Sequence, residues 1–123
     1  MKFEILNRPT DFQAALRHRR LESSKHFDLF GFDAHQSLPR LGLVISRKAA
    51  PRAVTRNLVK RIARESARQA RSLPSLDFVV RAKIGLAVDW TAAKKSKSLA
   101  AFRRELRAEV DQLLLRTTTH RSS

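Results

Sequence analysis

Residues 54–71 most constrain the fold, because they separate cations from small and apolar side chains at helical spacing. On a helical wheel at about 100° per residue, the cations and the one asparagine occupy less than half of the circumference. We call these residues the basic face: Arg56, Asn57, Lys60, Arg61, Arg64, Arg68 and Arg71. The opposite arc holds Leu58, Val59, Ile62, Ala63, Ser66 and Ala70. The pattern predicts a helix that packs one side against a sheet and turns its basic face outward.

The sign of the charge on this helix indicates a polyanionic partner. A solvated helix face usually mixes acids with bases, because opposite charges four residues apart stabilise a helix and like charges destabilise it. Here only Glu65 lies near the basic face. The whole chain holds 26 Lys and Arg against 11 Asp and Glu, a formal net charge of +15. Arginine also matches the geometry of phosphate oxygens. At this level RNA, DNA and an anionic membrane surface remain open as partners.

Several classes of protein are disfavoured by what the sequence lacks. No stretch approaches the roughly 18 to 20 apolar residues that span a bilayer, and residues 1–8 have no apolar core of the kind a signal peptide needs. Without cysteine there is no disulfide and no thiolate metal site, which fits a reducing cytoplasm. The histidines show no metal-ligand spacing and the acids are scattered. We therefore expect no catalytic site and no metal site within the protein itself.

Periodicity predicts helices and strands in the order α-β-β-α-β-α, in a chain whose length suits a single domain. A first helix starts at Pro9, with Thr10 and Gln13 as reciprocal caps, and carries Phe12, Ala15, Leu16 and Arg19 on one face. The expected strands are His26–Phe32, Arg40–Ser46 and Leu76–Lys83, the first two as an antiparallel pair. A last helix begins near Ser98 and has the apolar stripe Leu99, Phe102, Leu106, Val110, Leu113 and Leu114. We expect a polar connection over 85–97, a domain over 1–115 and a flexible tail over 116–123.

Aromatic side chains beside this much positive charge suggest a platform for single-stranded nucleic acid, where stacking contributes roughly 1 to 3 kcal/mol per base. The best candidates are Phe12 and either Phe27 or Phe30, each of which is equally consistent with an ordinary core residue. Phe78 and Phe102 are expected in the core, and the role of Trp90 stays open.

Two consecutive motifs resemble the bacterial ribonuclease P protein family. Residues 40–48 read RLGLVISRK, against a family strand of the form R-x-G-x-x-x-S-[KR]-K. Residues 53–65 read AVTRNLVKRIARE, against A-V-x-R-N-R-x-K-R-x-x-R-[EQ]. Asp11-Phe12-Gln13, the strand that starts at Phe27, and Asp77-Phe78-Val79-Val80 also agree. The resemblance covers about residues 5 to 115, nearly the whole chain.

The resemblance implies an α+β fold, in which a mixed sheet packs with helices and the strand–helix–strand crossover is left-handed, against the usual right-handed rule. It also implies the protein subunit of an endoribonuclease whose catalyst is an RNA subunit using Mg²⁺, so that the isolated protein is not catalytic. The implied partners are that RNA and precursor tRNA, with no membrane and no protein partner required, and the implied compartment is the cytoplasm.

Site residues follow from the motif together with the helical wheel and the basic loop. The residues expected to bind the catalytic RNA are Arg47, Arg52, Arg56, Asn57, Lys60, Arg61, Arg64 and Arg68. Those expected to bind the single-stranded 5′ leader of precursor tRNA are Phe12, Phe27, Phe30 and Lys48. Three departures matter: the motif's second arginine is Leu58, the loop 49–52 is one residue longer than usual, and a frequent second aromatic of the first helix is Leu16.

Two other functions share the charge and the fold class. A structural RNA-binding or ribosome-associated protein would show no preference for substrates with a 5′ leader. A nucleoid protein would prefer duplex DNA, which the aromatic strand disfavours.

Overall fold

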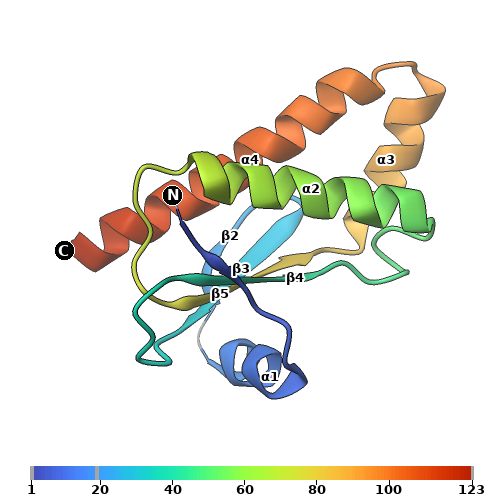
Figure 1. The fold of residues 1–123 in the computed structure, drawn as a ribbon. Coiled ribbons are helices and arrows are strands. Elements are labelled where there is room, and N and C mark those ends of the chain that lie inside the picture. Colours follow the sequence, from blue (N-terminus) through green and yellow to red (C-terminus); the bar gives the residue numbers. More distant parts are fainter. Residues whose placement is uncertain (1, 19, 123) are drawn as a thin grey trace.

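The computed structural model describes residues 2–18 and 20–122, with side chains up to residue 117. Helices cover both faces of a five-stranded mixed sheet in the strand order β1-β4-β5-β3-β2 (Figure 1). The strands are β1 (Glu4–Ile5), β2 (Arg20–Ser23), β3 (Phe27–Phe32), β4 (Arg40–Val44) and β5 (Asp77–Ala82). The helices are α1 (Pro9–Arg17), α2 (Ala53–Gln69), α3 (Gly85–Lys95) and α4 (Leu99–Ser122). The α+β fold class is confirmed.

Strand β5 lies at the centre of the sheet, parallel to β4 and antiparallel to β3. The expected antiparallel pair of β3 and β4 is therefore wrong. One edge of β4 pairs with β1, and the helical crossover through α2 places β5 along the other edge. Strand β3 then pairs with the far edge of β5. Periodicity defines the strands but says nothing about which strands are neighbours. The left-handedness of this crossover stays a prediction.

Alternation along β3 divides the interior into two clusters, as the sequence predicts. Phe27 and Leu29 point into the main core between the sheet and helices α2 and α4, together with Phe78, Val80 and the α4 stripe. Phe30 and Val79 point to the opposite face, where they pack with Leu6 and Ala15 under α1. Figure 1 shows α1 alone on its side of the sheet. One face is thus the structural core, and the other is covered by one short helix.

Several elements differ from the sequence predictions. Strands β1 and β2 were not expected, and residues 85–95, expected as a connection, form α3 with Leu86 fully buried. Thr10 lies inside α1 and not at its cap: Pro9 starts the helix after Arg8, without a side-chain cap. Helix α4 continues to Ser122, and buried Thr117 donates to the Leu113 carbonyl at 3.0 Å, so packed helix extends beyond the domain boundary expected at 115. Arg19, expected on the face of the first helix, lies outside the described residues.

Helices α3 and α4 are joined to the start of β3 by buried His26. Its Nδ1 lies 2.6 Å from a carboxylate oxygen of Glu109, and its Nε2 lies 2.6 Å from one of Asp89. The hydrogen bond with His26 lowers the pKa of Asp89 below its ordinary value.

None of the helices in the described part of the chain combines the length and apolar character needed to cross a membrane.

A buried ion pair connects the two central parallel strands below α1. The guanidinium of Arg40 donates to Asp77 through Nε at 2.7 Å and Nη2 at 2.6 Å, and its Nη1 lies 3.5 Å from Asp11 of α1. The hydrogen bond with Asp77 raises the pKa of Arg40. Since Asp77 is 1% exposed, its negative charge is compensated by this bidentate contact with Arg40 and not by water. The pair therefore fixes β4 to β5 and orients α1.

Helix α1 also lies close to the sheet at Gly42. A Cβ atom added there would lie 2.5 Å from Cε1 and 2.8 Å from Cζ of Phe12, and 3.0 Å from Cδ2 of Leu6. Any side chain at position 42 would clash with the Phe12 ring, so the glycine of the motif is what allows this ring to pack against the sheet.

We predict that Asp77→Ala lowers the free energy of unfolding by about 3 to 5 kcal/mol, because it leaves the Arg40 charge without its main partner in a mostly buried site. Asp11→Ala, which removes only the longer contact at 3.5 Å, should cost less than about 1 kcal/mol. Urea denaturation of both variants measures the difference. Equal losses would contradict the special role of the Asp77 pair.

We predict that Gly42→Ala lowers the free energy of unfolding by about 1 to 3 kcal/mol, because the new methyl group displaces the Phe12 ring. Gly85→Ala is the matched control: it lies in α3 with no heavy atom within 4 Å of the added Cβ, so its stability should stay the same or rise by up to about 1 kcal/mol. Thermal unfolding compares the two. A Gly42→Ala protein as stable as the Gly85→Ala protein would show that the Phe12 ring does not pack closely enough on Gly42 to exclude a methyl group.

Candidate nucleic-acid interface

Helix α2 is held by a row of small residues that face α4 and the sheet. Val59, Ala63, Ser66 and Ala67 are buried, and the Ser66 hydroxyl donates to Asp111 of α4. Leu58 and Ile62, which the sequence places on the packed arc, are only partly buried. The packed side is thus centred nearer to Ala63 and Ala67 than expected, which leaves the opposite side of the helix to solvent.

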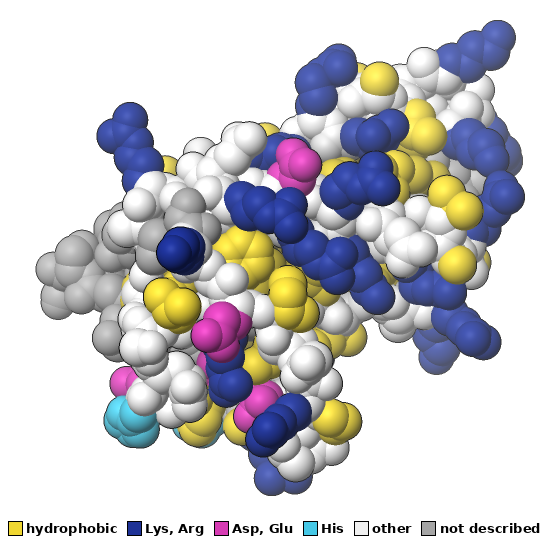
Figure 2. All heavy atoms as spheres, viewed as in Figure 1, with side chains coloured by type: hydrophobic (Ala, Val, Ile, Leu, Met, Phe, Trp, Pro, Cys, Tyr) yellow, Lys and Arg dark blue, Asp and Glu magenta, His cyan; other side chains and the backbone are white. Residues whose placement is uncertain are grey.

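The basic face forms a continuous surface along α2. Asn57, Arg61 and Arg68 are exposed, and Lys60 and Arg64 are half-buried along the edge of the packed side. With Glu65, these residues line a shallow depression of about 550 Å³. Figure 2 shows Lys and Arg side chains gathered over α2 and α3, with few acidic groups among them. A depression with this lining suits a chain of phosphates.

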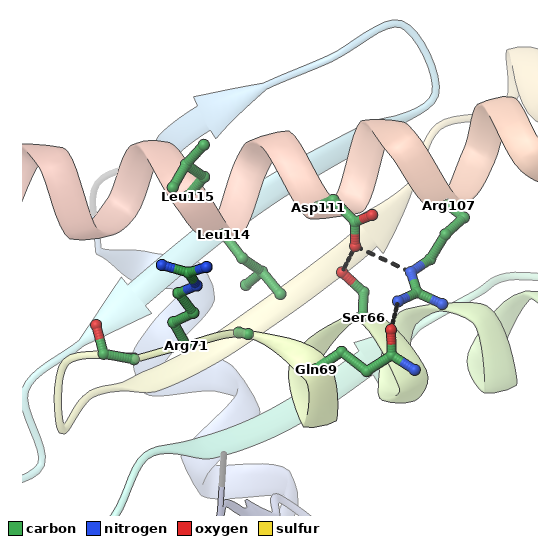
Figure 3. A pocket seen from close by; sticks show the side chains of 9 residues that line it. Ser66, Gln69, Arg71, Arg107, Asp111, Leu114 and Leu115 are labelled. Carbon is green, nitrogen blue, oxygen red and sulfur yellow. Dashed lines mark hydrogen bonds and ion pairs between the residues drawn. The ribbon is translucent and has the colours of Figure 1, made fainter.

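The acid beside the basic face does not neutralise it. Glu65 lies 4.0 Å from Arg107 of α4, and Arg107 also donates to Asp111 at 2.9 Å and to Gln69 at 2.8 Å. Figure 3 shows Arg107 between these last two partners. Across the described ranges, no ion pair joins Lys60, Arg61 or Arg64 to a carboxylate. These three cations are therefore available to an external anion.

Two arginines of the predicted basic face have other positions. Arg56 donates from Nη1 to the carbonyls of Ala50 and Pro51 at 3.0 and 2.9 Å, so that it fastens the preceding loop to the helix. Arg71 follows the end of α2 at Gln69 and lines a separate hollow of about 520 Å³ between α2 and α4 (Figure 3). The helix that carries the basic face thus ends before Arg71.

The loop before α2 has two buried residues at its centre, and the predicted cations lie around them. Ala49 and Ala50 are buried, and Arg47, Lys48 and Arg52 are exposed around them. The backbone N–H of Ala49 donates to the Ser46 hydroxyl at 3.2 Å. The longer loop is therefore anchored by this bond and by its two buried alanines, and its three cations are left exposed to solvent.

The aromatic part of the predicted site needs one correction. Phe27 is 0% exposed and lies in the main core, on the side of the sheet away from α1, so it cannot stack on a base in this structure. Phe30 lies on the α1 side but is only 6% exposed, beneath the guanidinium of Arg81 at 4.7 Å. Phe12 is half-buried over Gly42. Alternation indicates that Phe27 and Phe30 point oppositely, but it does not tell which face is more deeply covered.

Arg81 is a residue of this surface that the sequence analysis missed. Its half-exposed side chain covers the Phe30 ring and lies 3.4 Å from Asp28. The alternation of β5 could have found it, because Asp77, Val79 and Arg81 must share one face and Val79 pairs with Phe30. The α1 side of the sheet thus offers a cation and aromatic rings together.

No group of three or more His, Asp or Glu side chains among residues 2–18 and 20–117 is placed to hold a metal ion. The surface instead presents cations along α2 and, on the α1 side of the sheet, a guanidinium over an aromatic ring.

Comparison with known proteins identifies the family. The profile of the Ribonuclease P family matches residues 1–117. The ribonuclease P protein component of Bordetella parapertussis is 44% identical over 112 residues, covering 86% of this chain and 85% of the relative. That of Bordetella avium is 39% identical over 111 residues, covering 86% and 84%.

Solved structures agree on the fold. The RNase P protein of Staphylococcus aureus aligns with a TM-score of 0.66 at 19% identity, over 96% of this chain and 94% of that one. The RNase P protein of Thermotoga maritima aligns with a TM-score of 0.63 at 23% identity, over 89% and 96%. With a family profile that matches residues 1–117 and a relative 44% identical over most of both chains, the chain belongs to the ribonuclease P protein family.

Proposed function

We propose that this chain is the protein subunit of ribonuclease P, and that it binds the catalytic RNA and the 5′ leader of precursor tRNA to promote maturation of the tRNA 5′ end. The observation that carries the proposal is the basic face of α2. Lys60, Arg61 and Arg64 have no carboxylate partner within the described residues, and they line a depression that fits a phosphate chain. A family of RNA-processing subunits explains why this uncompensated charge is present.

The proposal assigns different RNA segments to different sides of the molecule. The basic face of α2 and the loop cations Arg47 and Arg52 bind the folded catalytic RNA through its phosphates. The α1 side of the sheet binds the single-stranded leader, with Phe12 and Arg81 as contacts. Support for the second part is the pairing of a guanidinium with an aromatic ring, a combination that suits unstacked bases. We also assign Lys48, which is exposed in the loop before α2, to the leader.

Catalysis in this proposal belongs to the RNA subunit, with Mg²⁺ bound mainly by RNA. The protein then contributes binding and orientation, which strengthen the complex at low Mg²⁺, where phosphate repulsion is least screened. Its work requires no further protein partner, and we place it in the cytoplasm, where precursor tRNA is processed.

A structural RNA-binding protein with no processing role is the second candidate. The surface on the α1 side favours ribonuclease P, since a protein that only neutralises phosphates has no need of a cation stacked over an aromatic ring. The two candidates differ in the response to a 5′ leader.

We predict that changing Lys60 and Arg61 together to Ala weakens binding of the ribonuclease P RNA by roughly thirtyfold, at about 1 kcal/mol for each lost phosphate contact. Cleavage of precursor tRNA at low Mg²⁺ should lose its stimulation by the protein to a similar degree. The matched control changes Arg103 and Arg104, two exposed arginines of α4, to Ala, which removes the same charge from another helix. Filter binding and a single-turnover cleavage assay measure both effects.

Two outcomes would contradict this prediction. Equal losses in both double variants would make net charge, and not the basic face, responsible. Unchanged stimulation after the Lys60 and Arg61 changes would remove α2 from the interface. If the wild-type holoenzyme bound precursor and mature tRNA equally well, the structural RNA-binding candidate would be favoured.

A further inference from the structure

A second hollow lies beside the basic face, between the start of α2, the loop before it and α3. Its volume is about 670 Å³, within the range of ligand-binding clefts. Val54, Leu58, Trp90 and Leu99 provide its apolar lining. Arg52, Lys94 and Lys95 provide its charged lining. Figure 2 shows hydrophobic side chains exposed among Lys and Arg in the region of α3 and the neighbouring end of α2.

The apolar part of this hollow is open to solvent at the start of α2. Val54 is 74% exposed, although it lies in the first turn of a helix whose next turns are packed. Leu58 is only partly buried, and it occupies the position where the resembled motif carries its second arginine. Because Leu58 follows Asn57 directly and precedes Arg61 by three residues, the hollow continues the basic face around α2. An apolar surface here replaces one charge of the motif.

The charged lining has a single sign. No Asp or Glu lines the hollow, and within the described ranges Arg52, Lys94 and Lys95 form no ion pair with a carboxylate. Lys94 and Lys95 come from the last turn of α3. An apolar peptide would cover the apolar residues but would leave three cations without partners. A ligand with both a flat apolar part and a negative charge matches the whole lining.

Trp90 is held in place and still has unused bonding capacity. Its ring meets Phe102 edge-on, with centroids 6.1 Å apart and planes at 72°, which limits rotation of the indole. The indole N–H has no hydrogen-bond partner among the described residues and is available to an acceptor on a ligand. An oriented aromatic ring with a free donor beside cations is the combination that binds an unpaired base.

We propose that this hollow binds an unpaired nucleotide of the RNA partner, with its base against Trp90 and Leu58 and its phosphates on Arg52, Lys94 and Lys95. The proposal rests on the proposed function, because it assigns a second contact to the same RNA. It gives α2 a contact with an RNA base, whereas the other exposed residues of this helix are proposed to bind the RNA phosphates. Replacement of the motif arginine by Leu58 then exchanges one phosphate contact for part of a base site.

Trp90 makes the proposal directly measurable, because the chain contains one tryptophan and no tyrosine. Its emission should be quenched when the ribonuclease P RNA of the same organism is titrated into the full-length protein. Val54→Glu places a negative charge in the hollow, and at the first turn of a helix an acid is tolerated, so the variant should fold. We expect it to weaken RNA binding roughly tenfold and to abolish the quenching.

Val88→Glu is the matched control. It makes the same chemical change at an apolar residue of α3 that is 69% exposed and does not line the hollow. This variant should bind and quench like the wild type. Circular dichroism of both variants verifies that the fold is intact.

The outcomes separate this inference from the proposed function. Equal weakening by both Glu variants would overturn the inference, because general repulsion would explain it. Normal binding by Val54→Glu, or binding without quenching in the wild type, would also overturn it, because the RNA would then not occupy the hollow. If wild-type protein bound the ribonuclease P RNA no better than an unrelated RNA of equal length, the proposed function itself would fail, and the inference with it.

Discussion

The cations of α2 repel one another, and the packing on the opposite side of the helix is what holds them together. Like charges at spacing four cost a few tenths of a kcal/mol per pair. The small buried residues Val59, Ala63 and Ala67 offset this cost by placing the helix against α4 and the sheet. Helix α4 also provides a partner for Glu65, the acid beside the basic face, because Arg107 lies within ion-pair distance of both Glu65 and Asp111. Binding of a polyanion would relieve the remaining repulsion.

The sheet supports the two sides of the molecule in different ways. Towards α2 and α4 it carries the large buried residues and forms a continuous core. Towards α1 it carries a small apolar cluster, the Arg40 and Asp77 ion pair, and Gly42 below Phe12. The first side provides rigidity to the basic face, and the second leaves rings and cations near the surface. The motif residues Arg40 and Gly42 are therefore structural supports, and the residues proposed to touch RNA lie around them.

Much of this arrangement could be predicted from the sequence, because it depends on local spacing. The helical wheel found Lys60, Arg61 and Arg64, and alternation found the two faces of β3. The position of β5 between β3 and β4 could not be found, since strand pairing is decided by long-range contacts. Burial of Phe27 depends on α4, which is distant in sequence, so its pattern looked the same as that of Phe30. Helix α3 was missed because its buried residues, Leu86 and Ala93, are too few to give a clear period.

The salt dependence of binding to the ribonuclease P RNA tests the central claim most directly, because each phosphate contact releases counterions. If the basic face of α2 and the loop cations Arg47 and Arg52 together neutralise about six phosphates, the logarithm of the association constant should fall with the logarithm of salt concentration at a slope of about −5. Affinity should then drop on the order of a thousandfold between about 50 and 200 mM salt. A slope near zero to −2 would contradict the account, since it would leave most of these cations outside the interface.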